Sequence, residues 1–295
     1  MFLNQLRINE FDSLINNFTQ VKEWYFGDVF TYAIAQHYGF YTDIIDFTND
    51  LDVALFFACC KYDKEKKKYV PLTEEDIKSN KYGLLFQRSD FDNTQCFLQN
   101  YDKRKFNPRI FPMDYQPFTK SDLFRRFTSI NDPCFTGTDP AILPIGYQPF
   151  TRCNKQGGYF IHTKYGEDIQ SKSNFKIFRF KHSTKLSNEL YNKYKGGEKL
   201  FNYDVLDEIS DLLEIIKTAK KFSNESFENT YMQLHGNLTK EEWRRTLKEN
   251  EQVTIGETPY NLPKERIDAI NKKWSIQKFI ENEGLLPWIR KQFYK

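Results

Sequence analysis

The sequence predicts an α+β fold, in which helices flank a mixed, mainly antiparallel central sheet and a helical extension follows at the C-terminal end. Apolar residues recur with helical spacing at both ends of the chain, and segments of alternating apolar and polar residues lie in its middle. Aromatic residues make up 17% of the 295 residues, which excludes wholesale disorder. We expect one domain over residues 1–222 and the extension, packed on it, over 223–295.

The first elements are expected to be helices. Over residues 1–32, apolar side chains recur at the spacing of one helical face. They are Phe11, Leu14, Ile15 and Phe18. A second helical run is expected to end near Gly39, because glycine often terminates helices. Residues 41–47 follow as a short strand of apolar and β-branched side chains around two carboxylates.

A helix over residues 51–60 is expected next, with Asp50 as its N-cap. Its sequence LDVALFFACC is apolar almost all round, which predicts a helix buried on every side. The charged run KYDKEKKK at residues 61–68 is expected to be the solvated end of this helix and a loop.

Strands and helices continue along the rest of the chain. The expected strands are 82–87, 159–162 and 175–180, and the expected helices are 205–222, 241–248 and 264–280. The strand FKIFRF at 175–180 alternates cleanly, so its phenylalanines are assigned to the core. Residues 88–150 read as loop-rich and contain the pentapeptide YQPFT at 115–119, with a second copy at 147–151. The closing LLPWIR is expected to dock onto the body of the protein.

Composition narrows the class of protein. A net charge of +3 gives no electrostatic signal for a nucleic-acid or membrane-surface partner. The five cysteines form no C-x-x-C pair and the four histidines are scattered, so neither a disulfide framework nor a metal site is expected. The segment MFLNQLRINEFD does not resemble a signal peptide, and no apolar run reaches the roughly 20 residues that span a bilayer. We therefore expect a reduced, cytoplasmic protein.

The strongest functional signal lies in the stretch from Ala33 to Cys60. Two polar clusters, Gln36-His37 and Asp46-Thr48-Asn49, lie inside sequence that otherwise reads as core. A buried polar group without a partner costs roughly 1–3 kcal/mol. These side chains are therefore expected to bind one another or a ligand.

This stretch resembles the FRG domain, a bacterial family with poorly defined biochemistry. The family signature, AQHYG-x-x-T-R-x-L-D-W-T and then a VALxFA helix, corresponds to Ala35–Gly39, Thr42, Asp46–Thr48 and Val53–Ala58. Two later segments also resemble family motifs. They are Arg152 with Gln156-Gly157-Gly158-Tyr159-Phe160, and Leu200–Asp204 with Leu206 and Glu208. The resemblance then covers roughly residues 10–220.

The chain departs from the family pattern at two points. The F/Y-R-G tripeptide of the family is absent, since the nearest string, Tyr25-Phe26-Gly27, lacks the arginine. We expect either a start upstream of Met1 or a member without this strand. Asp43 occupies the position where the family commonly has arginine. Both changes weaken an anion site, because arginine is the side chain best suited to phosphate.

Several alternatives remain for the candidate residues. His37 and Asp46 are the acid/base candidates, with Asp46 orienting His37, or else a buried structural pair. Thr48 and Asn49 either bind ligand or, as the pattern favours, cap helix 51–60. The pair Gln156-Gly157 lacks the spacing of a phosphate loop, which favours a turn that opens a strand.

Two functions follow from these observations. The first is an enzyme-like protein that binds a nucleotide or similar anionic ligand between the AQHYG–D-F-T segment and the Q-G-G-Y-F strand. Its catalytic residues would be His37 and Asp46, and its ligand-binding residues Gln36, Thr48, Asn49, Arg152, Gln156 and Gly157. Analogy with ADP-ribosyltransferases suggests NAD, and the family resemblance loosely suggests phage defence or a toxin system. The alternative is a non-catalytic binding or regulatory module whose polar motif is a structural network.

Overall fold

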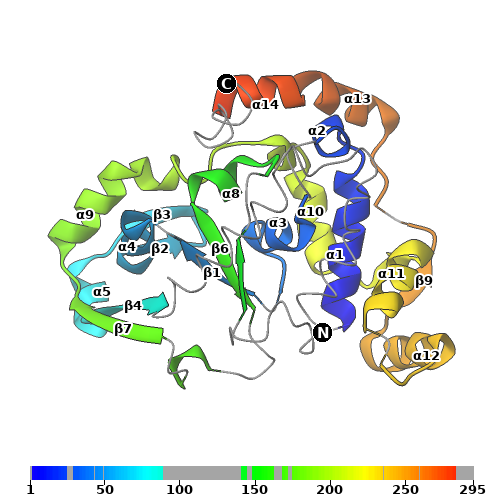
Figure 1. The fold of residues 1–295 in the computed structure, drawn as a ribbon, viewed down its shortest axis with the longest axis horizontal. Helices are drawn as coiled ribbons and strands as arrows, with labels where there is room; N and C mark the ends of the chain where they lie inside the picture. Colours follow the sequence, from blue (N-terminus) through cyan, green and yellow to red (C-terminus); the bar gives the residue numbers. More distant parts are fainter. Residues whose placement is uncertain are drawn as a thin grey trace, which may run out of the picture.

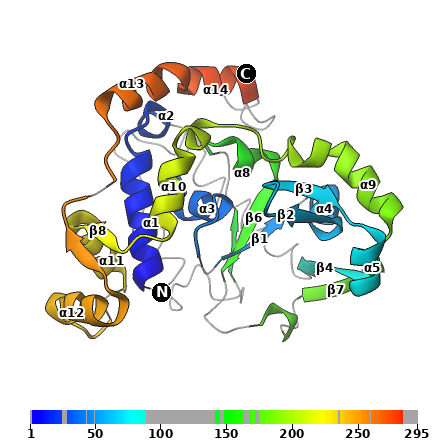
Figure 2. The same ribbon diagram turned by 180° about the vertical axis from the view of Figure 1, so that it is seen from behind.

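The computed structural model describes residues 2–24, 29–42, 44–48, 50–88, 141–144, 148–162, 168–171, 175–234, 236–258 and 260–283. Helices and short, mostly antiparallel strands alternate along this part of the chain, which confirms the α+β prediction. Figures 1 and 2 show a small sheet in the middle of the molecule, with long helices on one side and shorter elements with strand pairs on the other.

The central sheet joins segments that are far apart in the sequence. Its strand order is β1-β6-β5, formed by Ile44–Thr48, Gly158–His162 and Ala141–Pro144, and both pairings are antiparallel. Across β1 and β6, Asp46 faces Phe160 and Thr48 faces Gly158. The strands predicted at residues 41–47 and 159–162 are therefore present. Their pairing places the D-F-T segment beside the Q-G-G-Y-F strand.

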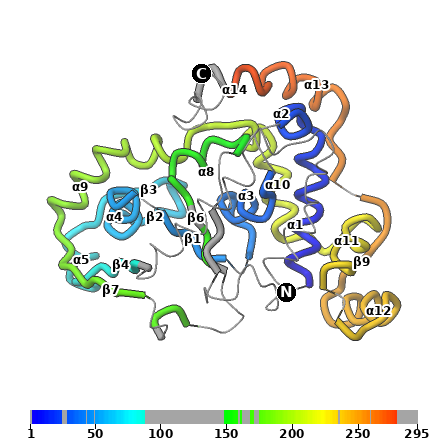
Figure 3. Tube along the Cα trace, in the orientation of Figure 1, coloured from blue at the N-terminus to red at the C-terminus, as the bar shows by residue number. Residues whose placement is uncertain are grey.

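Helices α1 (Phe2–Ile15), α3 (Thr31–His37) and α10 (Ser210–Lys217) form the core on one side of this sheet. The predicted helical face of the N-terminal stretch is buried, as are the predicted stripe positions that precede and enter α10. These residues are Phe11, Leu14, Ile15, Phe18, Leu206, Ile209, Leu213 and Ile216. Helix α3 ends before Gly39, whose φ of +82° favours a residue without a Cβ. Figure 3 traces α3 against α1 and α10.

Helix α4 (Leu51–Cys59) lies on the other side of the sheet. Its N-cap is Asp50, as predicted, because the Asp50 carboxylate accepts hydrogen bonds from the N–H groups of Asp52, at 2.9 Å, and Val53, at 3.3 Å. The prediction of burial on every side was wrong. Leu51 is 65% exposed and Phe57 is 39% exposed, so α4 has only one buried face.

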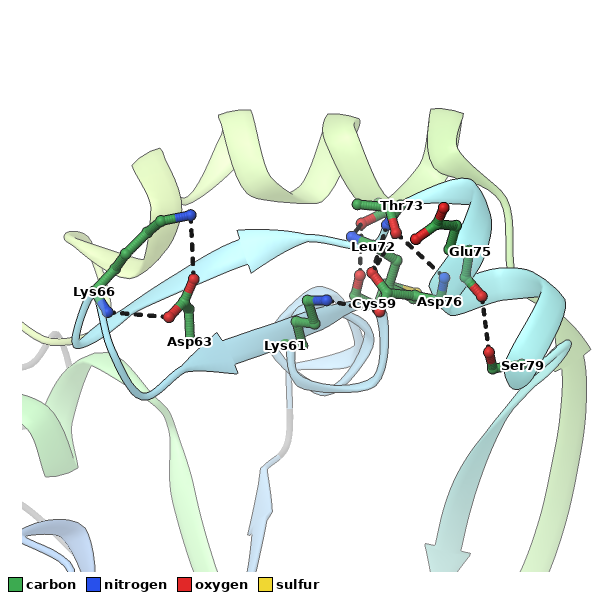
Figure 4. Close-up of polar contacts among 10 residues, drawn as sticks. Cys59, Lys61, Asp63, Lys66, Leu72, Thr73, Glu75, Asp76 and Ser79 are labelled. Carbon is green, nitrogen blue, oxygen red and sulfur yellow. Dashed lines mark hydrogen bonds and ion pairs between the residues drawn. The ribbon is translucent and has the colours of Figure 1, made fainter.

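The charged run after α4 forms a β-hairpin and not the predicted helix end and loop. Strands β2 (Cys60–Asp63) and β3 (Lys68–Pro71) pair antiparallel, with their charges exposed as predicted. Asp63 accepts hydrogen bonds from backbone N–H groups at the turn. At the other end of the hairpin, Asp76 of α5 (Glu74–Ser79) pairs with Lys61 at 2.6 Å. Figure 4 shows Asp63, Lys61 and Asp76 among the polar contacts of this region. The hairpin is therefore held at both ends by carboxylates.

The two segments predicted as strands at 82–87 and 175–180 are β4 (Tyr82–Arg88) and β7 (Phe175–Lys181). They form a second antiparallel pair. The assignment of the β7 phenylalanines to the core was wrong in part, because Phe175 is buried but Phe178 is 50% exposed. A sheet of two strands has two faces, and in the described structure only part of this one packs against other elements. Alternation alone does not reveal which face is covered.

The C-terminal part consists of helices and one small parallel sheet. The predicted helix 205–222 is divided into η3 (Val205–Ile209), α10 and strand β8 (Lys221–Ser223), which pairs with β9 (Thr254–Gly256). The predicted helix 264–280 is broken near Trp274 into two helices. The further elements of the described chain are α2 (Thr19–Lys22), α8 (Thr151–Lys155), η1 (Ile169–Ser171), α9 (Thr184–Lys193), η2 (Lys195–Gly197), α11 (Asn224–Leu234), α12 (Lys240–Glu251), α13 (Lys264–Lys273) and α14 (Ile276–Glu283).

Helix α1 belongs to two hydrophobic clusters. Its Phe11 lies in the cluster around the central sheet, whereas its Leu6 lies in a second cluster with Phe227 and Leu247 of the C-terminal helices. Polar contacts connect the same helices, since Asn9 donates a hydrogen bond to Thr230 at 2.8 Å. The division at residue 222 stays a prediction, and α1 contacts the elements on both sides of it.

Some expectations fall on parts of the chain that the structure does not describe. They concern Asp43, Asn49, the string Tyr25-Phe26-Gly27, the first YQPFT copy and the closing LLPWIR. Within the described residues, no helix combines the length and the apolar composition that a membrane span requires.

Candidate functional site

A pocket of about 610 Å³ is lined by residues of α3, β1, α4, β4 and β6. Its polar lining consists of Gln36, His37, Asp46, Thr48 and Gln156. The structure thus brings five of the eight predicted site residues to one pocket. Asn49 lies outside the described residues, and Arg152 and Gly157 are not among the lining residues that the structure describes.

His37 lies at the last position of α3, and its ring packs against Phe160 of β6 with 5.4 Å between ring centroids. Its Nε2 atom is buried and has no hydrogen-bond partner among the described residues. Burial, and then the positive charge of Arg152, lower the pKa of His37 to about 4. The imidazole is therefore neutral at neutral pH, and its Nε2 has no partner among the described residues of a side chain that lines the pocket.

Asp46 contributes a carboxylate from the middle of β1. Burial raises its pKa to about 6, and a hydrogen bond from Gln36 opposes that rise. Asp46 is exposed to solvent at its position in the pocket lining. The expected pairing with His37 differs from the one observed, since the partner that holds Asp46 is Gln36.

The orientation of Gln36 is fixed by a second contact. The Thr42 hydroxyl donates a hydrogen bond to Gln36 Oε1, which leaves the amide N–H₂ group to donate to Asp46. Thr42 and Gln36 both belong to the motif quoted above. They hold the Asp46 carboxylate in place without placing a charge beside it.

Thr48 and Gln156 connect β1 to the turn before β6. Thr48 Oγ1 donates to the backbone carbonyl of Gln156 at 2.7 Å and accepts from the N–H of Asp50 at 3.0 Å. The Gln156 amide donates to the carbonyl of Leu200 at 3.2 Å, and the next residue, Gly157, has a φ of +54°. These contacts match the predicted turn that opens a strand. They use the Thr48 hydroxyl as donor and acceptor, and the Gln156 amide as donor to one backbone carbonyl.

Arg152 lies behind the pocket in a buried polar network. Its guanidinium pairs with Asp207 at 2.8 Å and lies over the ring of Tyr38, 4.1 Å from the centroid. Tyr38 in turn donates a hydrogen bond to the fully buried Asp204. Burial raises the pKa of Asp204 to about 6, and the Tyr38 hydroxyl and Arg152 oppose that rise. Arg152 therefore has structural partners in this network, and its positive charge contributes to the lowered pKa of His37.

Sequence reasoning missed one wall of the pocket. Leu84, Leu85 and Phe86 of β4 and Phe57 of α4 contribute to it, with Phe160 of β6. The strand YGLLFQ was recognisable, but nothing local in it indicates that it faces residues 36–48. Its position depends on its pairing with β7, about 90 residues later.

The lining determines which ligands the pocket favours. Among the described lining residues there is no lysine or arginine, and Asp46 and His37 are the titratable side chains. No group of three or more metal-binding side chains occurs in the described parts of the chain. This portion of the pocket is suited to a ligand with an apolar or aromatic body and a few hydrogen-bonding atoms.

Comparison with known families gives one match. The model of the FRG domain matches residues 3–67, which confirms the resemblance over that stretch. It includes α3, β1 and α4, and therefore Gln36, His37, Asp46 and Thr48. Comparisons with curated proteins and with solved structures found no match.

Proposed function

From the match of residues 3–67 to the FRG domain, we propose that this protein binds the base or nicotinamide ring of a nucleotide in the pocket between α3, β1 and β4. The observation that carries the proposal is that His37, whose buried Nε2 has no partner among the described residues, and Asp46 both line one pocket with aromatic walls. A buried polar atom without a partner is costly, and a ligand that pairs with it removes that cost.

The shape of the wall supports a planar ligand. Phe57, Phe86 and Phe160 come from three different elements and all contribute to the pocket. Aromatic side chains bind flat rings by stacking or edge contacts, and base stacking of this kind contributes roughly 1–3 kcal/mol. The volume of about 610 Å³ falls in the range of small-molecule and cofactor sites.

The same geometry supports an enzyme whose proton acceptor is Asp46. A carboxyl group with a pKa of about 6 is ionised at pH 7 and is more basic than an ordinary aspartate. Neutral His37 would bind and orient the ligand and would not act as a cationic acid. NAD is the first candidate ligand, by analogy with ADP-ribosyltransferases. A role in bacterial phage defence or a toxin system rests on the family resemblance alone.

A second candidate is a binding or regulatory module without catalysis. It is favoured by the number of motif residues that have structural partners, above all Tyr38 with Asp204, and Thr48 with Gln156. In such a module, ligand binding would persist while no substrate is converted. The two candidates therefore share the pocket and differ in turnover.

A thermal-shift screen tests the shared part of the proposal. The ligands are NAD, ADP-ribose, ATP and GTP, each added to the wild type and to His37→Ala. A ligand at a hundredfold excess over its Kd stabilises the folded state by about 2.7 kcal/mol, which is a readily measured rise in Tm. We expect at least one ligand to stabilise the wild type and not the variant. If no ligand stabilises the wild type, the pocket is not a nucleotide site.

Turnover separates the two candidates. The wild type and Asp46→Asn are incubated with the ligand that binds, and its products are separated by chromatography. Conversion that Asp46→Asn abolishes would support the enzyme. Binding without conversion by the wild type would support the module.

A further inference from the structure

The described polar lining of the pocket contains a hydrogen-bond-accepting carboxylate but no lysine or arginine to pair with it. The Asp46 carboxylate only accepts hydrogen bonds when ionised, and the described lining contains no cation to pair with it. His37 Nε2 is a buried neutral nitrogen without a partner. A ligand that satisfies both atoms must bring at least one N–H group of its own.

We propose that the pocket selects ligands by an N–H donor edge, in the form of a planar heterocycle that carries an exocyclic amine or carboxamide. The donor group pairs with Asp46, and a neighbouring ring or amide atom contacts His37 Nε2. This inference rests on the proposed function and specifies which part of the nucleotide the described pocket recognises. Phosphate groups, by contrast, would meet a carboxylate without a compensating charge.

The contacts around Asp46 support recognition by a fixed carboxylate. Thr42 orients the Gln36 amide, and Gln36 donates to Asp46. A carboxylate has about four acceptor positions, so one hydrogen bond from Gln36 leaves several for a ligand. Because the group is held before binding, little side-chain freedom is lost when a ligand pairs with it.

The charged surroundings of Asp46 do not offer an alternative partner. The titratable groups that interact with it are Tyr69 of β3 and Cys153 of α8, and burial raises the pKa of both well above neutrality. His37 faces the same pocket from α3 and is neutral at pH 7. The nearby arginine, Arg152, is paired with Asp207. A donor-bearing ligand therefore meets an ionised carboxylate that no described cation neutralises.

Matched pairs of small molecules test this inference on the unaltered protein. Nicotinamide is compared with 3-acetylpyridine, adenosine with purine riboside, and guanosine with inosine, by ligand-observed NMR and calorimetry. Each pair keeps the ring and differs in its N–H₂ group. A hydrogen bond to a charged group typically changes affinity by roughly tenfold to a hundredfold, so we expect the donor-bearing member of at least one pair to bind at least about tenfold more tightly.

Two variants test whether the Asp46 carboxylate causes the preference for the donor-bearing ligand. Asp46→Asn is expected to remove most of the difference within the pair that binds. Asp268→Asn, the same change at an exposed position on α13, is expected to preserve it. A difference that survives in a folded Asp46→Asn protein would overturn the assignment to Asp46.

The pH dependence distinguishes donor recognition from anion recognition. Between pH 5 and pH 7.5, Asp46 becomes ionised while His37 stays neutral, so affinity for the donor-bearing probe should rise. Affinity for an anionic probe, inorganic pyrophosphate, should instead fall or be absent. If both members of every pair bind equally, the donor-edge inference fails and the nucleotide proposal stands. If no ring compound and no nucleotide binds, the proposed function itself fails.

Discussion

Acidification is expected to destabilise this protein through His37. The pKa of His37 is lowered from its ordinary value of 6.5 to about 4 in the folded state. Between these values, the unfolded chain binds a proton that the folded chain excludes, so the free energy of unfolding falls as the pH falls. Above about pH 7.5 the imidazole is at least nine-tenths neutral in both states and contributes almost no pH dependence.

The size of the effect follows from the two pKa values. At pH 5, the unfolded imidazole is almost fully protonated and the folded one is about one-tenth protonated, which lowers the free energy of unfolding by about 2 kcal/mol relative to pH 7.5. Below pH 4 the loss reaches its limit of about 3 kcal/mol. The substitution His37→Gln keeps a neutral hydrogen-bonding side chain and removes the titration.

Urea unfolding of the wild type and His37→Gln at pH 7.5 and pH 5 measures this contribution. The raised pKa of Asp46 has the opposite sign, because the folded chain retains a proton there and acidification favours folding. That contribution is present in both proteins and cancels in the comparison. We expect the wild type to lose about 2 kcal/mol more than the variant between the two pH values. Equal losses would refute the burial of a neutral His37.

Three further substitutions test the contacts that support the site. Tyr38→Phe removes the donor to the buried carboxylate of Asp204 and should cost about 1–3 kcal/mol in urea unfolding, whereas Tyr41→Phe at an exposed position should cost almost nothing; equal values would contradict the buried contact. Thr48→Val breaks two hydrogen bonds between β1 and its neighbours and should lower the free energy of unfolding by about 1–3 kcal/mol. An unchanged Tm would contradict a stabilising role of these two bonds. Asp50→Ala removes the cap of α4 and should lower the free energy of unfolding by about 1 kcal/mol. If Asp50→Ser restores that free energy, the loss is due to capping.

Local signals predicted the α3–β1–α4 stretch well. The stop at Gly39, the strand around Asp46 and the cap at Asp50 each depend on residues within one or two turns of each other. Such features are encoded by backbone freedom, side-chain branching and capping oxygens, which are visible in one sequence. The candidate site residues of this stretch were identified because polar side chains interrupt sequence that otherwise reads as core.

Features that have no local sequence marker, or that depend on long-range pairing, were not predictable in this way. The hairpin in the charged run has a turn in which Lys67 adopts a φ of +51°, and no glycine or asparagine marks it. Likewise, the place of β4 in the pocket wall and the exposure of Phe178 depend on which elements cover each face. A single sequence shows the alternation of apolar and polar side chains along a strand, but it does not show which other element covers each face of that strand.

The two-sided packing of α1 has a consequence for synthesis of the protein. Helix α1 is translated before the C-terminal helices, and Leu6 can contact Phe227 and Leu247 only after more than 200 further residues have been translated. At 5–20 residues per second, that interval is on the order of 10 to 40 s. During it the apolar face of the helix that carries Leu6 has no final partner, so the nascent chain is expected to depend on chaperone binding until its C-terminal helices emerge from the ribosome.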